Sequence, residues 1–115
     1  MVDIFKTRTQ SIELAAKSLG IIEPGETLAT EDFDTFDGLV DPLVAQLASD
    51  EIVHISNTEE IELAYFLPFS RLLANVAGPH FGSPINEDAR RVDEQELRRL
   101  TSTRPLYTPL EGTYY

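Results

Sequence analysis

Apolar residues recur with the period of an α-helix in four segments of this chain. The four segments are residues 9–20, 29–51, 57–82 and 85–102. The positions expected to be buried are Ile12, Ala15, Ala16 and Leu19, then Phe33, Phe36, Val40, Leu43 and Leu47, then Ile61, Ala64, Tyr65, Leu72, Leu73 and Val76, and last Ile85, Ala89, Val92 and Leu100. Because each set lines one side of a helix, the pattern predicts a small all-α bundle of four to five helices.

The ends of these helices are marked by residues that commonly begin or stop a helix. Side chains that can accept a hydrogen bond from the first free amides stand at three of the starts, and the candidates are Thr9, Thr30 and Asn57 or Thr58. Gly20 and the pair Gly78-Pro79 are candidate stops, because Gly adopts the left-handed conformation and Pro cannot continue a helix.

Two prolines disturb the helical pattern. Pro42 would clash with the carbonyl of Gly38 in a straight helix. Either the helix kinks there, or Asp41 caps a fresh helix with Pro42 in its first position. Pro68 predicts a kink in the third helix. Residues 51–56, EIVHIS, favour an extended backbone and are expected to form a short connector or half of a small hairpin.

The segment STRPLYTPLEGTYY, residues 102–115, cannot continue a helix because Pro105 and Pro109 lack a backbone donor. We predict a helical bundle over residues 1–101 and an extended arm over residues 102–115. The apolar residues of the arm follow no helical or strand period, and tyrosines are favoured interface anchors. The residues expected to bind a partner are Arg104, Leu106, Tyr107, Leu110, Tyr114 and Tyr115. The arm docks on another subunit, or else it wraps its own bundle.

Charge narrows the choice of partner. The 115 residues carry 20 acidic and 9 basic side chains, a formal net charge of -11. Residues 1–63 hold fourteen acids and three bases, whereas residues 64–115 hold six of each. The bundle is therefore expected to have an acidic and a near-neutral side, unless these charges only solvate ordinary helix surfaces. The excess of acid disfavours nucleic acid or an anionic membrane as a direct partner and favours protein.

Motifs that carry chemistry are scarce. His54 and His80 lie far apart in sequence and in unlike contexts, and no nucleotide-binding or metalloprotease motif occurs. The stretch DFDTFDG fails as a calcium loop, because Val44 stands where that loop needs a Glu. Cys is absent, and no segment approaches the roughly eighteen apolar residues of a membrane span. We expect a protein that is not an enzyme, binds no cofactor or metal, and has no membrane partner.

Arginines gather in the last helical segment. Arg91 and Arg98 are seven positions apart, so they share one side of a helix. They are suited to meet an acidic partner or an acidic copy of the same protein, and we predict a role between subunits for both. The alternative is that each side chain is simply solvated at the surface.

Several stretches of the chain resemble a known family. The order of SLGIIEPGETLATED, LVDPLVAQLA and IELAYFLPFSRLLANVAGPHFG, followed by a charged helix, is similar to that of the head-to-tail adaptor proteins of tailed bacteriophages, also called connector or tail accessory factors. The most telling piece is LPFSRLLANVAGPHFGSP, which is similar to the family's long helix ending in an aromatic-Gly pair. The resemblance covers most of residues 7–101.

The resemblance implies a structural protein of the virion. Members of this family form a ring, commonly of twelve copies, beneath the portal ring, where they complete the DNA-filled head and provide the platform for the tail. The implied partners are the portal, other copies of the chain and a downstream tail protein. The implied location is the neck of the virion, with assembly in the host cytoplasm.

A family member of this kind often runs a C-terminal arm along the portal, which would explain residues 102–115. DNA would pass the channel without specific binding, because an acidic ring repels the phosphate backbone. Two other functions stay open at this stage. One is an acidic soluble regulatory module that binds a basic site on another protein. The other is a small helical enzyme that uses His54 or His80 with a carboxylate.

Overall fold

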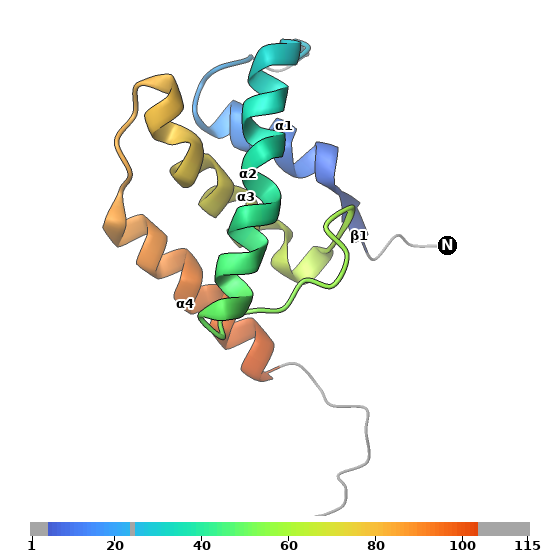
Figure 1. Ribbon diagram of the computed structural model, residues 1–115, viewed down its shortest axis with the longest axis vertical. Coiled ribbons are helices and arrows are strands. Elements are labelled where there is room, and N and C mark those ends of the chain that lie inside the picture. Colours follow the sequence, from blue (N-terminus) through green and yellow to red (C-terminus); the bar gives the residue numbers. More distant parts are fainter. Residues whose placement is uncertain (1–4, 24, 104–115) are drawn as a thin grey trace, which may run out of the picture.

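Four α-helices and a two-stranded antiparallel sheet make up the part of the chain that the structure describes, residues 5–23 and 25–103 of a computed structural model (Figure 1). The elements in order are β1 (Phe5–Thr7), α1 (Arg8–Ser18), α2 (Thr30–Ser49), β2 (Glu60–Glu62), α3 (Leu63–Ala77), a 3-10 turn η1 (Gly78–Phe81) and α4 (Glu87–Thr103). The predicted small all-α bundle is confirmed, with the short sheet as an addition.

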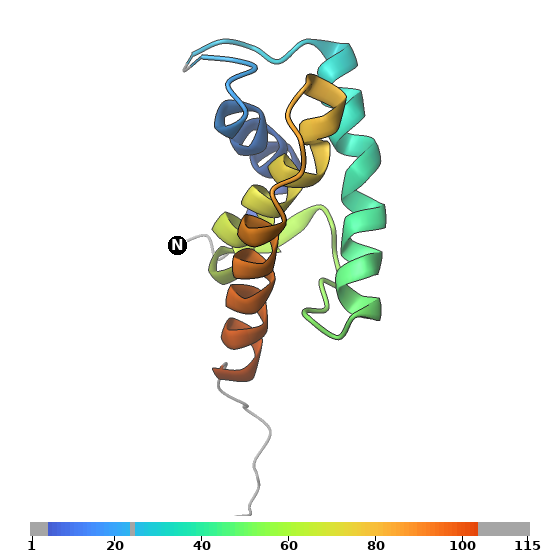
Figure 2. The ribbon, with the colours of Figure 1, turned by 90° about the vertical axis from the view of Figure 1, so that its left-hand side faces the viewer.

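The central element of the bundle is α3, which packs against α1, α2 and α4. Figure 2 shows α1 and α2 on opposite sides of it. Its buried residues are Tyr65, Pro68, Phe69, Ser70, Leu72, Leu73, Ala74 and Ala77. Because three helices cover it, α3 is apolar over more than the single stripe of a surface helix.

The second helix, α2, runs unbroken from Thr30 to Ser49 with Pro42 inside it, so no fresh helix starts at Asp41. Its predicted stripe is confirmed, because Phe36, Val40, Leu43 and Leu47 are buried and Phe33 is partly buried. The ring of Phe36 stacks on that of Phe81, with centroids 5.2 Å apart. This stacking joins α2 to the turn that follows α3.

The N-cap of the first helix lies two residues before the predicted one. Thr7, not Thr9, is its N-cap: the Thr7 hydroxyl accepts from the Gln10 amide at 3.1 Å, and the Gln10 side chain accepts from the Thr7 amide at 2.8 Å. This reciprocal pair satisfies two amides at once. Gly20 is confirmed as the stop, with a φ of 76° just after α1.

The second cap prediction was wrong as well. Thr30 is the first residue of α2. The N-cap of α2 is Ala29, whose side chain cannot accept a hydrogen bond. The start of α2 instead holds Glu31 and Asp32, whose negative charges interact favourably with the helix dipole.

The third predicted helix starts later than its sequence pattern suggested. Neither Asn57 nor Thr58 caps it, because residues 60–62 form β2 and α3 begins at Leu63. β2 pairs with β1 in the register Phe5↔Glu62, Lys6↔Ile61 and Thr7↔Glu60. The pairing lets Ile61 be fully buried while the backbone remains hydrogen-bonded. Ala64, expected inside, is exposed, and Val76 is only partly buried.

The connector alternative for residues 51–56 is confirmed. This stretch forms no strand, and Ile52, Val53 and Ile55 are buried, so its apolar side chains attach it to the core. Pro68 lies inside α3 and is buried. The predicted stop also holds, because α3 ends at Ala77 before Gly78. A Cβ at Gly78 would lie 2.7 Å from the carbonyl oxygen of Ser83, so this close approach requires glycine.

Most of the predicted apolar side of the last helix was wrong, although Leu100 is partly buried against the core. Val92 is 61% exposed and Ile85 lies outside α4, whereas Leu97 is fully buried. Asp93 is also buried, with its Oδ1 2.8 Å from Arg71 Nε on α3. Asp93 and Leu97 thus determine which side of α4 faces α3. A pattern of apolar residues could not predict this side, because aspartate is polar. α4 continues to Thr103, so the first two residues of the predicted arm belong to this helix. The rest of that arm, from residue 104 onward, lies outside the described residues.

Candidate interaction surfaces

The two arginines expected between subunits lie on the outer side of α4. Arg91 Nη1 is 3.2 Å from Asp88 Oδ1 on the same helix. Arg98 Nη2 donates to the carbonyl oxygen of Asp50 at 3.3 Å. Because Asp50 is the C-cap of α2, this bond holds a cation at the negative end of that helix. Both residues remain exposed, and their role between subunits stays a prediction.

A shallow polar hollow lies between α4 and the end of α2. It has a volume of about 240 Å³ and is lined by Asp50, Glu87, Arg90, Arg91 and Glu94. Arg90 Nε lies 3.1 Å from Glu94 Oε2, and both side chains are about three-quarters buried. The hollow therefore offers charges of both signs, which favours a polar contact over an apolar one.

A third ion pair within α4 lies further along the helix. Arg99 Nη2 is 2.6 Å from Glu96 Oε2. The hydrogen bond from Arg99 lowers the pKa of Glu96 below its ordinary value, and the same bond raises the pKa of Arg99. Both groups are exposed to solvent, so the pair orders the two side chains without contributing much to folding.

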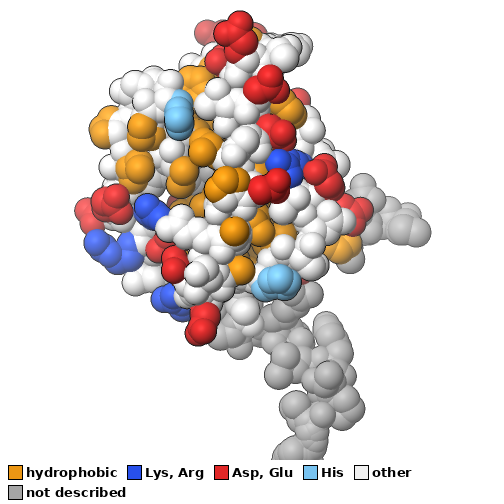
Figure 3. Space-filling view, viewed as in Figure 1, with side chains coloured by type: hydrophobic (Ala, Val, Ile, Leu, Met, Phe, Trp, Pro, Cys, Tyr) orange, Lys and Arg blue, Asp and Glu red, His pale blue; other side chains and the backbone are white. Residues whose placement is uncertain are grey.

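The opposite end of the molecule is acidic. No Lys or Arg occurs between Lys17 and Arg71, and Glu31 and Asp34 are exposed near the start of α2. The start of α2 and the end of α4 lie at opposite ends in Figure 1. In Figure 3, acidic side chains line the top and right, whereas most visible Lys and Arg side chains lie at the lower left, on the side of α4, with further acidic side chains among them. The fold therefore leaves the start of α2 acidic and gathers four arginines on α4, where they alternate with acidic side chains.

Arg8 is largely buried and donates hydrogen bonds to several acceptors. Arg8 Nε lies 2.7 Å from Asp37 Oδ1, and its Nη1 donates to Asp41 Oδ1 and Thr58 Oγ1, each at 3.0 Å. Glu59 Oε2 lies 3.4 Å from the same Nη1. The Arg8 side chain is 12% exposed. Burial by itself lowers the pKa of Arg8, but the hydrogen bonds to Asp37 and Asp41 outweigh it and raise the pKa.

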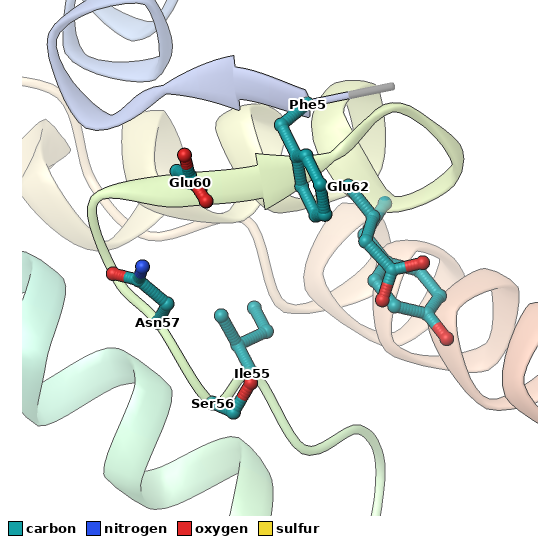
Figure 4. Close-up of a pocket in the computed structure, with 7 residues that line it drawn as sticks. Phe5, Ile55, Ser56, Asn57, Glu60 and Glu62 are labelled. Carbon is teal, nitrogen blue, oxygen red and sulfur yellow. The ribbon is translucent and has the colours of Figure 1, made fainter. Parts of the chain in front are cut away.

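A pocket opens beside the β1–β2 ribbon. It has a volume of about 140 Å³ and is lined by residues of β1, the connector, β2 and the start of α3. Figure 4 shows Phe5 and Ile55 on its walls, with Asn57, Glu60 and Glu62 around it. Oxygen acceptors and apolar carbons therefore meet in one small concavity.

The two histidines are separate and exposed. His54 lies in the connector and His80 in η1, and neither forms part of a cluster that could hold a metal ion among residues 5–23 and 25–103. No helix within those ranges is both long and apolar enough to cross a lipid bilayer.

In comparisons with known proteins, no family model, curated protein or solved structure matches this chain. The six residues predicted to bind a partner, Arg104, Leu106, Tyr107, Leu110, Tyr114 and Tyr115, lie outside the described residues. The resemblance to the adaptor family thus rests on the sequence patterns alone.

Sequence reasoning missed the pocket and the Arg8 cluster. The partners of Arg8 lie 29 to 51 residues away along the chain, and no local motif brings them together. The pocket likewise combines Phe5 with Ile55 and Tyr65. The available signal was the alternation of polar and apolar residues in EEIEL, which marks a half-buried strand.

Proposed function

We propose that this chain is a structural head-to-tail adaptor of a tailed bacteriophage. It forms a ring on the portal, completes the DNA-filled head and gives the platform for the tail, and it acts without catalysis or cofactor. The proposal starts from the resemblance of residues 7–101 to that family. It assigns the protein to the neck of the virion, after assembly in the host cytoplasm.

The arrangement of charge, with an acidic start of α2 and exposed arginines on α4, is the observation that supports the proposal most directly. A ring of identical subunits needs two different surfaces that fit each other, one on each side of the subunit. The start of α2 is acidic, whereas α4 carries exposed arginines among its own acidic residues, and the start of α2 and the end of α4 lie at opposite ends of the molecule. We expect the exposed arginines to meet the carboxylates of a neighbouring copy. Complementary charge of this kind sets the orientation of neighbours and speeds their encounter.

The remaining partners follow from the same proposal. Residues 104–115 dock on the portal, with the three tyrosines of that segment as anchors, and a downstream tail protein binds the far side of the ring. DNA passes through the channel without specific binding, because the excess of carboxylates repels phosphate. Appreciable binding of duplex DNA by the assembled ring at physiological salt would contradict this part.

Native mass spectrometry of the full chain, alone and mixed with the portal of the same phage, tests the proposal. We expect a ring of one defined copy number on the portal. Arg91→Gln and Arg98→Gln should each weaken that assembly, whereas Lys17→Gln, which removes an equal charge from the exposed end of α1, should leave it intact. A chain that stays monomeric with the portal present contradicts the adaptor proposal.

The docking segment is tested separately in the full chain. Replacing Tyr107, Tyr114 and Tyr115 by Ala should abolish portal binding, because tyrosine anchors bury large areas in interfaces. The matched control replaces Thr108 and Thr113 by Ala in the same segment. Equal portal binding by both variants would show that the tyrosines are not the anchors.

A second candidate function is an acidic regulatory module that occupies a basic site on another protein. The absence of Lys and Arg between Lys17 and Arg71 favours it, because that stretch presents carboxylates with few competing cations. Such a module binds its partner in a small stoichiometry and forms no ring. The same mass measurement therefore distinguishes the two functions.

A further inference from the structure

Two apolar side chains are unusually exposed on the layer formed by α3 and α4. Val92 of α4 is 61% exposed and Leu67 of α3 is 55% exposed, more than any other large apolar side chain of residues 5–23 and 25–103. Leu63 and Ala89, one turn before them on the same helices, are exposed as well. Exposed apolar residues that gather on one face are typical of a protein–protein contact.

Two polar contacts fix how α3 and α4 lie against each other. Asn75 exchanges two hydrogen bonds, each 2.8 Å long, with the backbone of Asn86. Arg71 Nε lies 2.8 Å from Asp93 Oδ1. The residue number rises along α3 where it falls along α4, so the two helices run antiparallel. Leu67, one turn before Arg71, is therefore level with the turn of α4 that follows Asp93.

Two charged residues complete this exposed patch. Leu67 and Arg71 are four positions apart on α3, and Val92 and Glu96 are four apart on α4, so each pair shares one side of its helix. After the hydrogen bond from Arg99, the charges of Arg99 and Arg71 also lower the pKa of Glu96, which places Arg71 near that carboxylate. Leu67 and Val92 therefore occupy opposite corners of a patch, with Arg71 and Glu96 at the other two. We call these four residues the α3–α4 face.

The α3–α4 face points away from α2. Arg98 donates to the carbonyl oxygen of Asp50 at the end of α2, so Arg98 lies on the flank of α4 toward that helix. Successive residues of a helix turn by about 100°, which puts Val92 and Glu96 on the opposite flank of the buried Asp93. Figure 2 shows α2 to the right of α3 and α4. Within the part of the chain that the structure describes, no helix or strand covers the face, as the exposure of its members shows.

The charges of the face suit a second copy of the same chain. A net charge of -11 makes two copies repel each other over most of their surface. The α3–α4 face instead offers one exposed cation and one exposed anion, because the side chains of Arg71 and Glu96 are 51% and 38% exposed. A twofold axis along the line from Leu67 to Val92 brings Arg71 of each copy to Glu96 of the other. The same axis sets Leu67 and Val92 each against its own counterpart.

We propose that the α3–α4 face binds a second copy of this chain in a twofold pair. Contact across the axis removes the two most exposed apolar side chains of each copy from water. The two Arg71–Glu96 contacts fix the orientation of the pair, because any other rotation sets like charges or a charge and an apolar side chain against each other. A face of this size gives a weak and reversible pair.

This inference goes beyond the adaptor proposal. A ring needs two different surfaces on each subunit, whereas a twofold pair uses one surface twice. The ring contact proposed above involves Arg91 and Arg98, and Arg98 lies on the flank of α4 opposite to Val92. Ring assembly is measured with the portal present and pairing is measured without it, so either proposal can fail while the other stands.

Cysteine crosslinking of the full chain tests the position of the axis. The chain contains no Cys, so a single introduced thiol reports on one position. A disulfide forms where two Cα atoms approach within about 7 Å. Leu67→Cys and Val92→Cys should therefore each give a linked dimer under mild oxidation with copper-phenanthroline. The matched control, Ala45→Cys, places the thiol on the exposed side of α2 and should react at least about tenfold more slowly.

Sedimentation velocity measures the pair without a crosslink. The average mass of the unmodified chain should rise from monomer toward dimer as the concentration increases to about 1 mM, the range of weak complexes. Glu96→Lys sets a cation against Arg71 of the other copy and should weaken the pair at least about tenfold. Glu31→Lys changes the charge equally at the exposed start of α2 and should not weaken it.

Several results would overturn the proposal. A chain that stays monomeric up to that concentration does so, whether residues 104–115 or another protein cover the face. Equal crosslinking of Ala45→Cys, crosslinking at only one of Leu67 and Val92, or equal effects of the two charge variants would do the same. Circular dichroism checks that each variant keeps its helices, which we expect because the buried Leu97 and Asp93 are unchanged in all of them.

Discussion

Arg8 Nε donates to Asp37 Oδ1 over 2.7 Å, although the two residues are 29 positions apart. The same guanidinium also donates from Nη2 to the backbone carbonyl of Asp37 at 2.9 Å. Gly38 directly follows Asp37, and its carbonyl would normally accept a hydrogen bond from the amide of residue 42. Because residue 42 is a proline without an amide hydrogen, this carbonyl lacks its usual helical donor. Arg8 therefore supports α2 at the turn that its proline weakens, and joins that turn to the start of α1.

Arg8→Met should lower the free energy of unfolding by about 2 kcal/mol, because the largely buried Arg8 side chain loses its charge-assisted hydrogen bonds to Asp37 and Thr58. Urea unfolding at neutral pH, followed by circular dichroism, measures the effect. Met retains the bulk of the stem, so the lost packing is small.

The control for this variant is Arg91→Met, which removes a cation whose partner Asp88 is exposed. Its effect should stay below about 0.5 kcal/mol. If both variants lowered stability equally, the Arg8 cluster would have no special role in the fold.

Leu97 and Val92 give a second comparison on one helix. Leu97→Ala should destabilise by about 3 kcal/mol, because it opens a cavity between α4 and α3. Val92→Ala should change stability by less than about 0.5 kcal/mol, since Val92 is mostly exposed. Thermal and urea unfolding of the two variants provide the test. The reverse order of effects would mean that α4 faces α3 with the side predicted from its hydrophobic pattern.

Ser11 and Ser70 are both fully buried, and the Ser70 hydroxyl donates to Ser11 Oγ at 3.3 Å between α1 and α3. Either single Ala variant should cost about 1 kcal/mol, because the remaining hydroxyl loses its partner. The double variant should cost no more than one single variant, since both polar groups are then gone. A double-mutant cycle in urea measures this coupling, and strictly additive effects would contradict it.

Asp93 is buried beneath Arg71, whose own side chain is half exposed. Arg71→Met should therefore destabilise the bundle by about 2 kcal/mol, because it leaves the carboxylate without this cation. Arg71→Met/Asp93→Asn should recover part of the loss by removing the charge. No recovery in the double variant would show that the lost contact is packing by the Arg71 stem.

The sequence predicted most of the helices because their periodicity is a local property. The stripe of α2 and the stop at Gly20 needed only neighbours within a few turns. The cap at Thr9 failed because a better reciprocal pair, Thr7 with Gln10, was available two residues earlier. The cap at Thr30 failed because α2 starts without a side-chain cap.

The acidic first half and the arginines of the last helix could also be predicted, because the net charge of a segment follows from counting its charged residues. Only the fold places the acidic start of α2 and the end of α4 at opposite ends of the molecule. The pocket beside β2 could not be predicted, since Phe5 and Tyr65 meet there only after residues 60–62 pair with β1.

The amino-acid sequence by itself determined an acidic helical bundle with α2 and α3 as its most apolar helices, because burial follows from periodic apolar residues. The tertiary structure alone decided which side of α4 faces inward and where the chain becomes a strand. Asp93 faces inward because it forms an ion pair with Arg71 of α3. Ile61 lies in a strand because the backbone of β1 pairs with it. The orientation of α4 and the strand at residues 60–62 both depend on groups distant in sequence. Their interaction energies arise only when these parts of the chain come into contact.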